Sequence, residues 1–255
     1  DDMKTQVDPR GNRLDWPAQS PTQLAQLLGD KRYAVRQRAI FESATRGQTM
    51  ITALRKTIDR SDTLSRQGAI WALTNIVGKA IMAEEQNDQI KQHTSTLQQA
   101  AQEVIRTALG DQNPLVRHIA VRSFSTHPDS LAQPQLIQLL KSEHPEIRRE
   151  AATALGRLGD PTAIEHLLAA LANPADIDRT EDHAIIFALI EIDNVPVTRQ
   201  GLVSDDPDSQ RGALLAVDQM TQAVDGNLTA EDVLRLVVSQ NPRTQLAAAH
   251  VFSQH

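Results

Sequence analysis

The chain has no cysteine among its 255 residues. Disulfides, thiolate zinc sites, cysteine nucleophiles and covalently attached c-type haem are therefore excluded from it. Aromatic residues make up only 3% of the sequence, so a buried core has to be built from Ala, Leu, Ile and Val. Such a core favours closely packed helices over β-sandwiches, which rely on aromatic and β-branched side chains.

Positive charge, long apolar runs and catalytic motifs are also lacking. The formal net charge of −6 disfavours a general electrostatic attraction to nucleic acid. No stretch approaches the roughly 18 consecutive apolar residues of a membrane span. There is no Gly-x-Ser-x-Gly elbow, no Gly-rich phosphate loop and no dinucleotide fingerprint, and the histidines form no HExxH or paired i, i+4 set. We therefore predict no catalytic residue, no metal site and no cofactor in this chain.

An internal repeat is the main feature that the sequence does contain. A short loop followed by Arg-x-x-Ala opens a helical pattern several times. Five of the six intervals between successive copies are 29 to 35 residues long, and the remaining one, which follows the second copy, is 51. Intervals of 29 to 35 residues are typical of two-helix repeats, and the interval of 51 residues indicates an insertion of roughly 20 residues. Complete copies begin at Arg36, Arg66, Arg117 and Arg148, and degenerate copies begin at Glu181, Gln210 and Gln245.

Each copy predicts a pair of helices joined by a polar turn. The turn often ends in Pro, preceded by Asp, Asn or Ser, which suits a capped helix start. In the second helix of one copy, Ile147, Ala151, Leu155 and Leu158 recur at helical spacing and mark a buried stripe. The pattern predicts seven pairs. Their second helices are expected at 33–46, 63–77, 115–126, 146–158, 178–192, 208–220 and 243–254.

The repeats do not cover the whole chain evenly. Residues 1–20 lack helical periodicity and are expected to form an extended lead-in, followed by a repeat solenoid over residues 21–255. The insertion falls near residues 79–96 and is mostly polar after Met82. It is expected to be either a solvated extension of a helix or a loose excursion.

The arginines that open the repeats have two interpretations. They are candidates for an anion site, but an Arg at the start of a second helix can also bond the Asp or the backbone carbonyls of the adjacent turn. We favour this structural role, because Arg at a buried edge is usually paired with acceptors. The residues concerned are Arg36, Arg66, Arg117 and Arg148.

The densest polar cluster lies at the predicted start of the fifth second helix. Its His could act as a metal ligand or proton carrier with a neighbouring carboxylate. The favoured alternative is that Asp178 caps the helix, Arg179 pairs with an acid and His183 bonds a neighbouring loop, because structural ion pairs mimic functional clusters. The cluster comprises Asp178, Arg179, Asp182, His183 and Glu191.

A candidate interaction surface follows from equivalent positions in the repeats. Phe41, Trp71, Arg122 and Thr153 each lie two residues after the repeat Ala, a row that can line the concave face of a solenoid. Trp71 beside Gln67 is the best candidate for a contact residue, although packing of Trp71 against a neighbouring helix is an equal alternative. A basic strip is a further candidate, against the alternative of a solvated surface. The strip would contain His118, Arg122, Arg149 and Arg157.

Several segments carry a family resemblance. They are Asp8-Pro9-Arg10-Gly11 with Leu14-Asp15-Trp16, residues 69–74 (AIWALT), residues 178–184 with 188–192, and residues 211–220 (RGALLAVDQM). The alternation of helices and turns resembles HEAT and HEAT-like (PBS lyase-type) repeats, which implies an all-α, right-handed α-solenoid of about seven HEAT-like helix pairs. The order of the segments is similar to that in the helical middle region of planctomycete-type dehydrogenase/cytochrome proteins. Asp182 departs from that family, in which Glu is usual.

The narrower resemblance implies a parent protein in which a sorbosone-dehydrogenase-like propeller precedes the helical region and a cytochrome c domain follows it. Such a parent would be periplasmic or secreted; without the resemblance the expectation is cytoplasmic. This chain contains neither propeller strands nor CxxCH. We therefore expect it to be a non-catalytic module that contacts a partner protein or flanking domains of its own polypeptide. The alternatives are an accessory part of a fused dehydrogenase active site and, less favoured, nucleic-acid binding.

Overall fold

The computed structural model describes residues 8–59, 62–86, 91–172, 178–220 and 228–254. All regular secondary structure in these ranges is helical, and none of them contains a β-strand. The prediction of an all-α fold is therefore confirmed. Across these same ranges, no helix combines the length and the apolar character needed to cross a lipid bilayer.

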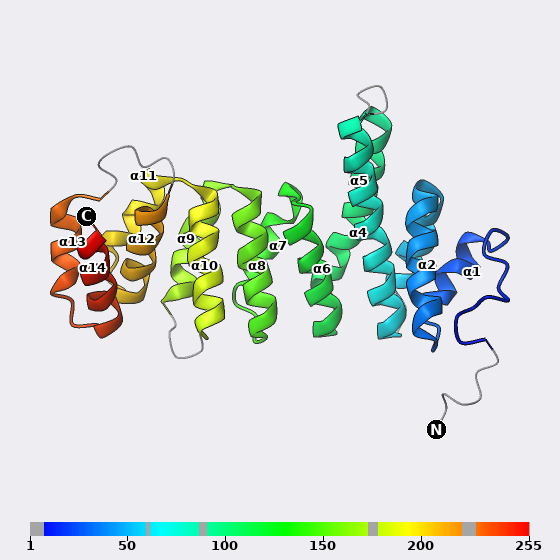
Figure 1. Cartoon of the computed structure of the whole chain (residues 1–255), viewed down its shortest axis with the longest axis horizontal. Helices are drawn as coiled ribbons and strands as arrows, with labels where there is room; N and C mark the ends of the chain where they lie inside the picture. Colours follow the sequence, from blue (N-terminus) through cyan, green and yellow to red (C-terminus); the bar gives the residue numbers. More distant parts are fainter. Residues whose placement is uncertain (1–7, 60–61, 87–90, 173–177, 221–227, 255) are drawn as a thin grey trace. The chain divides into compact units, whose positions relative to one another are not determined.

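The chain divides into two compact units, residues 1–123 and residues 124–255, here called unit 1 and unit 2. Within each unit, short first helices alternate with second helices that are usually longer (Figure 1). Unit 1 contains α1 (Pro21–Leu27), α2 (Tyr33–Arg46), α3 (Ile51–Ile58), α4 (Thr63–Gln86), α5 (Lys91–Thr107) and most of α6 (Pro114–Thr126).

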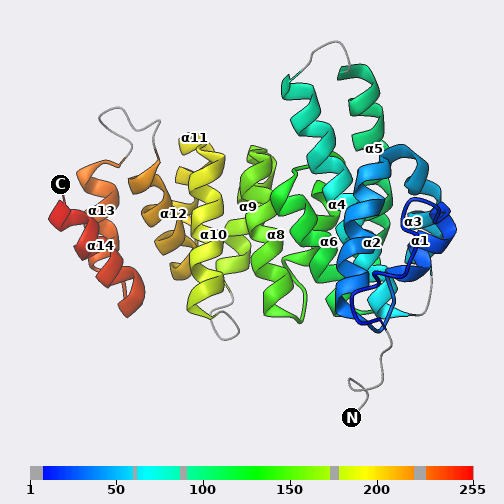
Figure 2. The same ribbon diagram turned by 45° about the vertical axis from the view of Figure 1, so that its right-hand side comes forward.

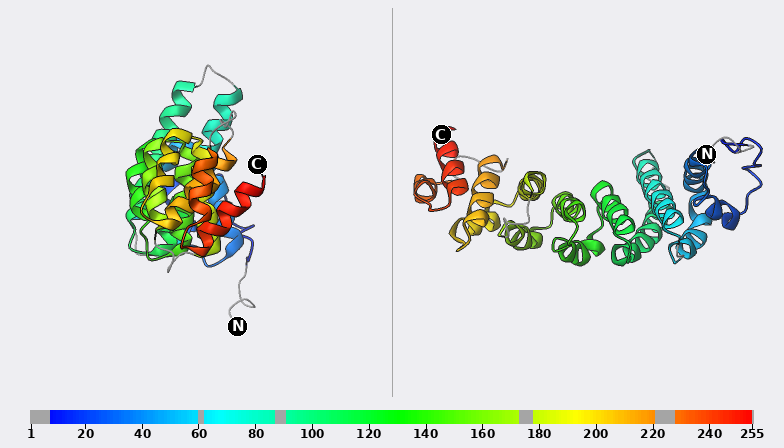
Figure 3. Two further views of the ribbon diagram at one scale, coloured as in Figure 1. Left: turned by 90° about the vertical axis from the view of Figure 1, so that its left-hand side faces the viewer. Right: turned by 90° about the horizontal axis from the view of Figure 1, so that it is seen from below.

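The described residues of unit 2 form four helix pairs in two layers. The second helices contact one another in succession along the chain, and each also packs on the first helix of its own pair. The two layers are visible when the helices are viewed end-on (Figure 3, right). The helices are α7 (Gln133–Leu139), α8 (Pro145–Leu158), α9 (Ile164–Leu171), α10 (Arg179–Ile192), α11 (Val195–Thr198), α12 (Pro207–Gln219), α13 (Ala230–Val237) and α14 (Pro242–Gln254).

Second helices begin within one residue of the predicted positions, and proline marks the start of several of them. Pro145, Pro207 and Pro242 are the first residues of α8, α12 and α14. Asp206 caps α12 by accepting a hydrogen bond from the backbone N–H of Ser209 at 2.7 Å. Pro fits the first turn of a helix because its missing N–H would have no intrahelical acceptor there.

The cap of α12 provides a prediction about stability. Asp206→Ala removes the acceptor for the Ser209 N–H, and we expect the free energy of unfolding to fall by about 1 kcal/mol. Asp205→Ala is a matched control, because Asp205 is exposed and precedes the cap. It should change stability by less than about 0.5 kcal/mol. Urea denaturation followed by circular dichroism measures both variants, and equal losses would contradict the capping role.

The repeats bury equivalent side chains. The residue four positions after the repeat Ala is at most 1% exposed in the first six pairs. In the last described helix, α14, the equivalent Phe252 is 57% exposed. The side chain at this position therefore packs inside the stack and is uncovered only in α14. The six buried residues are Ser43, Leu73, Phe124, Leu155, Ala188 and Val217.

The insertion is where the predicted helix boundaries differ most from the structure. The second helix predicted at 63–77 is α4, which continues to Gln86, and α5 begins at Lys91; residues 87–90 lie outside the described residues. The two ends are joined by a hydrogen bond of 2.7 Å from the Thr94 hydroxyl to Glu84. The described part of the insertion therefore extends a helical hairpin that projects beyond α2 (Figure 2).

The described part of the lead-in, residues 8–20, is also not extended as expected. It forms turns, and Trp16 is only 2% exposed. The Trp16 indole N–H donates to the Gly11 carbonyl at 2.9 Å, and Arg46 of α2 donates to the Trp16 carbonyl at 2.7 Å. Burial of this large side chain holds the segment against the first helix pair, a contact that helical periodicity does not reveal.

Candidate functional site

The predicted contact residue Trp71 lies on an exposed stripe of α4. Gln67, Trp71, Asn75 and Lys79 are spaced by four residues, so they follow one side of the helix. Trp71 is 36% exposed, Asn75 and Lys79 are exposed, and Gln67 is half-buried. The stripe therefore presents one aromatic ring, two amides and one ammonium group on the surface of unit 1.

Aromatic side chains are concentrated on the surface rather than in the core. The chain has four Phe, two Trp and one Tyr, and only Trp16 and Phe124 are buried. All five others lie on second helices and are at least 36% exposed. Because aromatic residues are enriched at protein interfaces, their placement makes the second helices candidate binding surfaces. They are Tyr33, Phe41, Trp71, Phe187 and Phe252.

Cations accompany the aromatic rings in unit 1. The Lys79 ammonium of α4 lies 5.0 Å from the ring centroid of Phe41 on α2 and donates to the Thr45 hydroxyl at 2.9 Å. The Arg38 guanidinium lies 4.7 Å from the ring centroid of Trp16. These cation–π contacts fix the positions of side chains that are otherwise flexible.

The remaining predicted surface residues of unit 1 are on α6. His118 is half-buried and Arg122 is exposed. A hydrogen bond of 2.8 Å between the hydroxyls of Thr74 and Ser123 links α4 to α6. The second helix of the third pair therefore lies next to α4.

The predicted surface residues of unit 2 all make contacts within that unit. Arg149 lies 3.6 Å from a carboxylate oxygen of Asp178. The Thr153 hydroxyl donates to the Arg149 carbonyl at 3.0 Å, and Arg157 donates to the Ser125 carbonyl at 2.7 Å. The predicted basic strip contains residues of both units, and a continuous strip stays a prediction.

The predicted polar cluster on α10 is divided among separate contacts. The Asp178 carboxylate accepts the Glu181 N–H at 2.8 Å, and this hydrogen bond is the main reason that the pKa of Asp178 is lowered. His183 is exposed and stacks on Phe187 with ring centroids 6.3 Å apart. Arg179 and Glu191 are exposed. In the described part of the chain, no three His, Asp or Glu side chains are grouped to hold a metal ion.

Asp182 belongs instead to an ion-pair network that joins three successive second helices. It accepts hydrogen bonds from Arg211 of α12, one of them at 3.1 Å, and lies 3.4 Å from Arg243 of α14. Asp208 is 3.3 Å from Arg211 and 3.1 Å from Arg243. The side chains of Arg211 and Asp208 are only 7% and 4% exposed, so the network occupies a helix interface. Sequence reasoning did not identify this role of Asp182.

Three of the four repeat arginines bind the turn that precedes their helix. In each case Nη1 donates to the backbone carbonyl six residues earlier, and the degenerate copy at Gln210 makes the same contact with its amide. Arg66 differs, because it pairs with the Asp111 carboxylate at 3.0 Å. The guanidinium groups therefore have protein acceptors. The four carbonyl contacts are Arg36 to Asp30 at 2.7 Å, Arg117 to Asp111 at 2.8 Å, Arg148 to Ser142 at 2.7 Å and Gln210 to Ser204 at 2.6 Å.

The turn before α2 predicts a pH dependence of stability. Hydrogen bonds from Arg32 to Asp30, at 2.8 and 2.9 Å, lower the pKa of Asp30. A lowered pKa in the folded state stabilises the fold above the ordinary carboxyl pKa, and this contribution is lost as the pH falls below about 4. In urea titrations, the free energy of unfolding should fall less between pH 7 and pH 3 for Asp30→Asn than for the unmodified chain. Equal losses would contradict the assignment.

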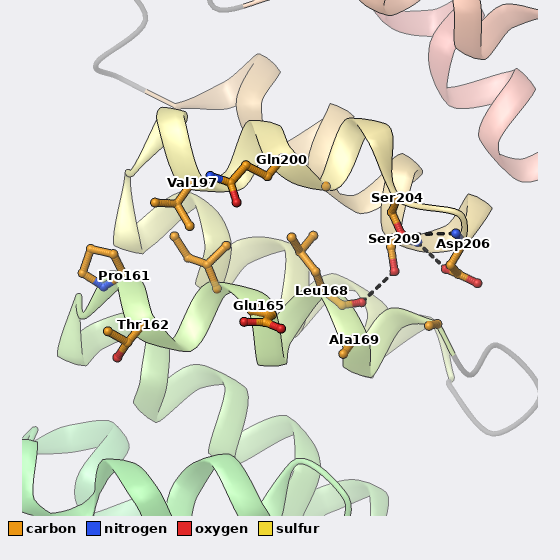
Figure 4. Close-up of a pocket in the computed structure, with 13 residues that line it drawn as sticks. Pro161, Thr162, Glu165, Leu168, Ala169, Val197, Gln200, Ser204, Asp206 and Ser209 are labelled. Carbon is orange, nitrogen blue, oxygen red and sulfur yellow. Dashed lines mark hydrogen bonds between the residues drawn. The ribbon is translucent and has the colours of Figure 1, made fainter.

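A groove of about 770 Å³ lies in unit 2 between α9 and the segment from α11 to α12 (Figure 4). Its apolar wall includes Ile164, Leu168 and Val197, and Glu165 and Gln200 contribute polar groups. The shape of such a groove suits an apolar ligand or side chain. None of its lining residues was predicted, because the groove depends on how first helices pack, which repeat periodicity does not specify.

A second hollow of about 610 Å³ lies between α7 and α9. Lys141, Glu143 and His166 contribute to its lining, together with the Arg148–Glu181 ion pair. Arg148 is already bonded to Glu181 and to the Ser142 carbonyl. The hollow therefore exposes part of a structural ion pair.

A family model of HEAT repeats matches residues 101–189, which extend from α5 into α10. No curated protein matches the chain. The region 101–189 is thus HEAT-like, as the repeat pattern predicts.

Solved structures give a fold-level likeness over most of the chain. A chain in the structure of Kap95p with RanGDP has a TM-score of 0.57 and 12% identity, covering 97% of this chain and 36% of that chain. An engineered protein has a TM-score of 0.50 and 18% identity, covering 91% and 67%. An archaeal HEAT-like repeats protein from Thermococcus onnurineus NA1 has a TM-score of 0.48 and 16% identity, covering 92% and 96%. The first two show the fold alone: the chain is an α-solenoid.

Proposed function

We propose that the chain is a non-catalytic scaffold module whose second helices contact a partner protein or a flanking domain. The observation that carries the proposal is the exposure of five of the seven aromatic side chains, all on second helices. Aromatic residues are enriched at protein interfaces, where they provide large contact areas at low conformational cost. A stack of helix pairs supplies an extended surface for such contacts.

The α4 stripe is the part of this surface that we propose makes the main contact in unit 1. Trp71 is an exposed anchor, and the amides of Gln67 and Asn75 flank it along the helix. Amide groups both donate and accept hydrogen bonds, so they match the polar groups of a protein backbone. Phe41 adds a second exposed ring on the neighbouring helix.

Photocrosslinking tests this proposal in the natural host. A benzophenone amino acid replaces Asn75 on the stripe or, as a control, Gln99, which is exposed on α5. We expect discrete crosslinked proteins from position 75. Excess unmodified chain should suppress these crosslinks by competing for the partner, whereas excess Trp71→Ala chain should not. Crosslinks that Trp71→Ala suppresses equally well, or that also form at position 99, would contradict the proposal.

A narrower proposal rests on the sequence resemblance alone. The chain would be the helical segment of an exported redox protein, next to a dehydrogenase domain and a cytochrome c domain. In that case the second helices would contact those domains and shape an active site that this chain does not itself contain. The intact mass and visible spectrum of the protein from its host test this. A mass well above 28.1 kDa with a haem band supports it, and a colourless protein of 28.1 kDa contradicts it.

A further inference from the structure

The surface of unit 1 around Trp71 differs in charge from the chain as a whole. We define the α2–α4 face by Phe41 on α2 and by Gln67, Trp71, Asn75 and Lys79 on α4. The chain carries a formal net charge of −6, whereas this set contains one cation and no acid. Nearby on α2, Arg38 pairs with Glu42 at 3.6 Å, whereas Lys79 contacts the Phe41 ring and the Thr45 hydroxyl, neither of which is a carboxylate.

The ammonium group of Lys79 is fixed in position but keeps capacity for a ligand. It lies over the Phe41 ring and uses one donor for the Thr45 hydroxyl at 2.9 Å. A lysine ammonium has three donors, so two remain for another acceptor. Because the cation–π contact already restrains the side chain, binding a carboxylate costs less conformational entropy.

The other groups of the face suit an extended polypeptide. Trp71 offers an apolar surface at 36% exposure, and Phe41 offers a second at 61%. Asn75 lies between Trp71 and Lys79 along the helix, where its amide can bond a backbone crossing α4. On α6, Arg122 adds an exposed guanidinium group beyond α4. The face thus combines two apolar rings, two amides and one cation.

We propose that the α2–α4 face binds an acidic segment of a partner protein that carries alternating apolar side chains. This inference rests on the proposed scaffold function and specifies the chemistry of its partner. Carboxylates of the segment pair with Lys79, and apolar side chains pack on Trp71 and Phe41. A single-stranded nucleic acid is less suitable, because it requires a dense row of cations along its phosphates and the chain is acidic overall.

Fluorescence anisotropy with the whole chain tests the proposal. The probe is a short labelled peptide in which Asp and Glu alternate with Leu and Phe, and its counterpart has Lys in place of every acid. We expect binding of the acidic probe that weakens as salt is added and little binding of the basic counterpart. Trp71→Ala and Lys79→Glu should each weaken binding of the acidic probe by about tenfold or more.

Matched variants in unit 2 separate this effect from general changes. Leu234→Ala shortens an exposed apolar side chain on the first helix α13, and Lys141→Glu reverses another exposed lysine; neither should change binding by more than about twofold. Circular dichroism checks that each variant is folded. The proposal is overturned if the acidic probe does not bind or if the basic probe binds equally well. It is also overturned if a single-stranded oligonucleotide displaces the acidic probe, or if the control variants lose as much affinity for this probe as Trp71→Ala and Lys79→Glu.

The crosslinking experiment distinguishes failure of this inference from failure of the scaffold function. If the acidic probe does not bind but crosslinks at position 75 still depend on Trp71, the scaffold function stands and the acidic chemistry is wrong. If neither the probe nor the crosslinks depend on Trp71, both proposals fail.

Discussion

Replacing Arg148 by Met is expected to lower the free energy of unfolding by about 3 to 5 kcal/mol, the cost of leaving a buried charge without its partner. Arg148 binds both carboxylate oxygens of Glu181, at 2.5 and 2.7 Å. It also donates to the Ser142 carbonyl, so it joins the turn before α8 to the first turn of α10. The Glu181 side chain is only 2% exposed, so its carboxylate would lose its ionic partner in a site largely shielded from solvent.

A double substitution identifies this cause. The double variant Arg148→Met/Glu181→Leu removes both charges and should recover most of the loss. Both tryptophans are in unit 1, so amide hydrogen exchange of α8 and α10, supported by circular dichroism, is the appropriate measurement.

The adjacent Arg149 provides the matched control. Arg149 and Asp178 are 34% and 51% exposed and lie 3.6 Å apart. Water screens such a pair, so Arg149→Met should cost less than about 0.5 kcal/mol. A similar loss in both single variants, or no recovery in the double variant, would show that the buried ion pair does not hold these repeats together.

Local features of the sequence account for most of the fold. Proline marks the starts of α8, α12 and α14, and Asp206 and Asn241 cap the last two. These helices begin within one residue of the predicted positions. The end of α4 could not be predicted in this way. Its polar continuation has no core stripe of its own, and it is joined to α5 by the hydrogen bond between Glu84 and Thr94.

The same distinction applies to the candidate sites. The bond from Arg148 to the Ser142 carbonyl spans six residues and follows from the geometry of the turn. The bond from Arg148 to Glu181 spans 33 residues and depends on how one pair stacks on the next. Sequence spacing placed Asp182 beside His183, but the stacking of α10 on α12 directs Asp182 to Arg211. Trp71 was identifiable because it occupies a repeat position, whereas Lys79 was recognised only once α4 was seen to extend past it.

Gly156→Leu is expected to destabilise the fold by about 3 kcal/mol, because α8 and α10 touch at this glycine. A Cβ atom at Gly156 would lie 2.7 Å from the Cα and 2.9 Å from the Cβ of Ala188. Since the nearest atom belongs to the backbone of α10, the two helices would have to separate. Gly156→Ala should show a smaller loss, because the overlap is partly offset by the roughly 1 kcal/mol that Ala gains over Gly in a helix.

Gly110 offers the control for these glycine substitutions. No atom lies within 4 Å of a Cβ placed there, and the residue is exposed. Gly110→Leu should therefore change the free energy of unfolding by less than about 1 kcal/mol. Hydrogen exchange in Gly156→Leu should increase in both α8 and α10, because a helix interface opens from both sides. If exchange increased in α8 alone, the substitution would act on the helix itself, and the close approach of Gly156 to Ala188 would not be what sets the spacing between these repeats.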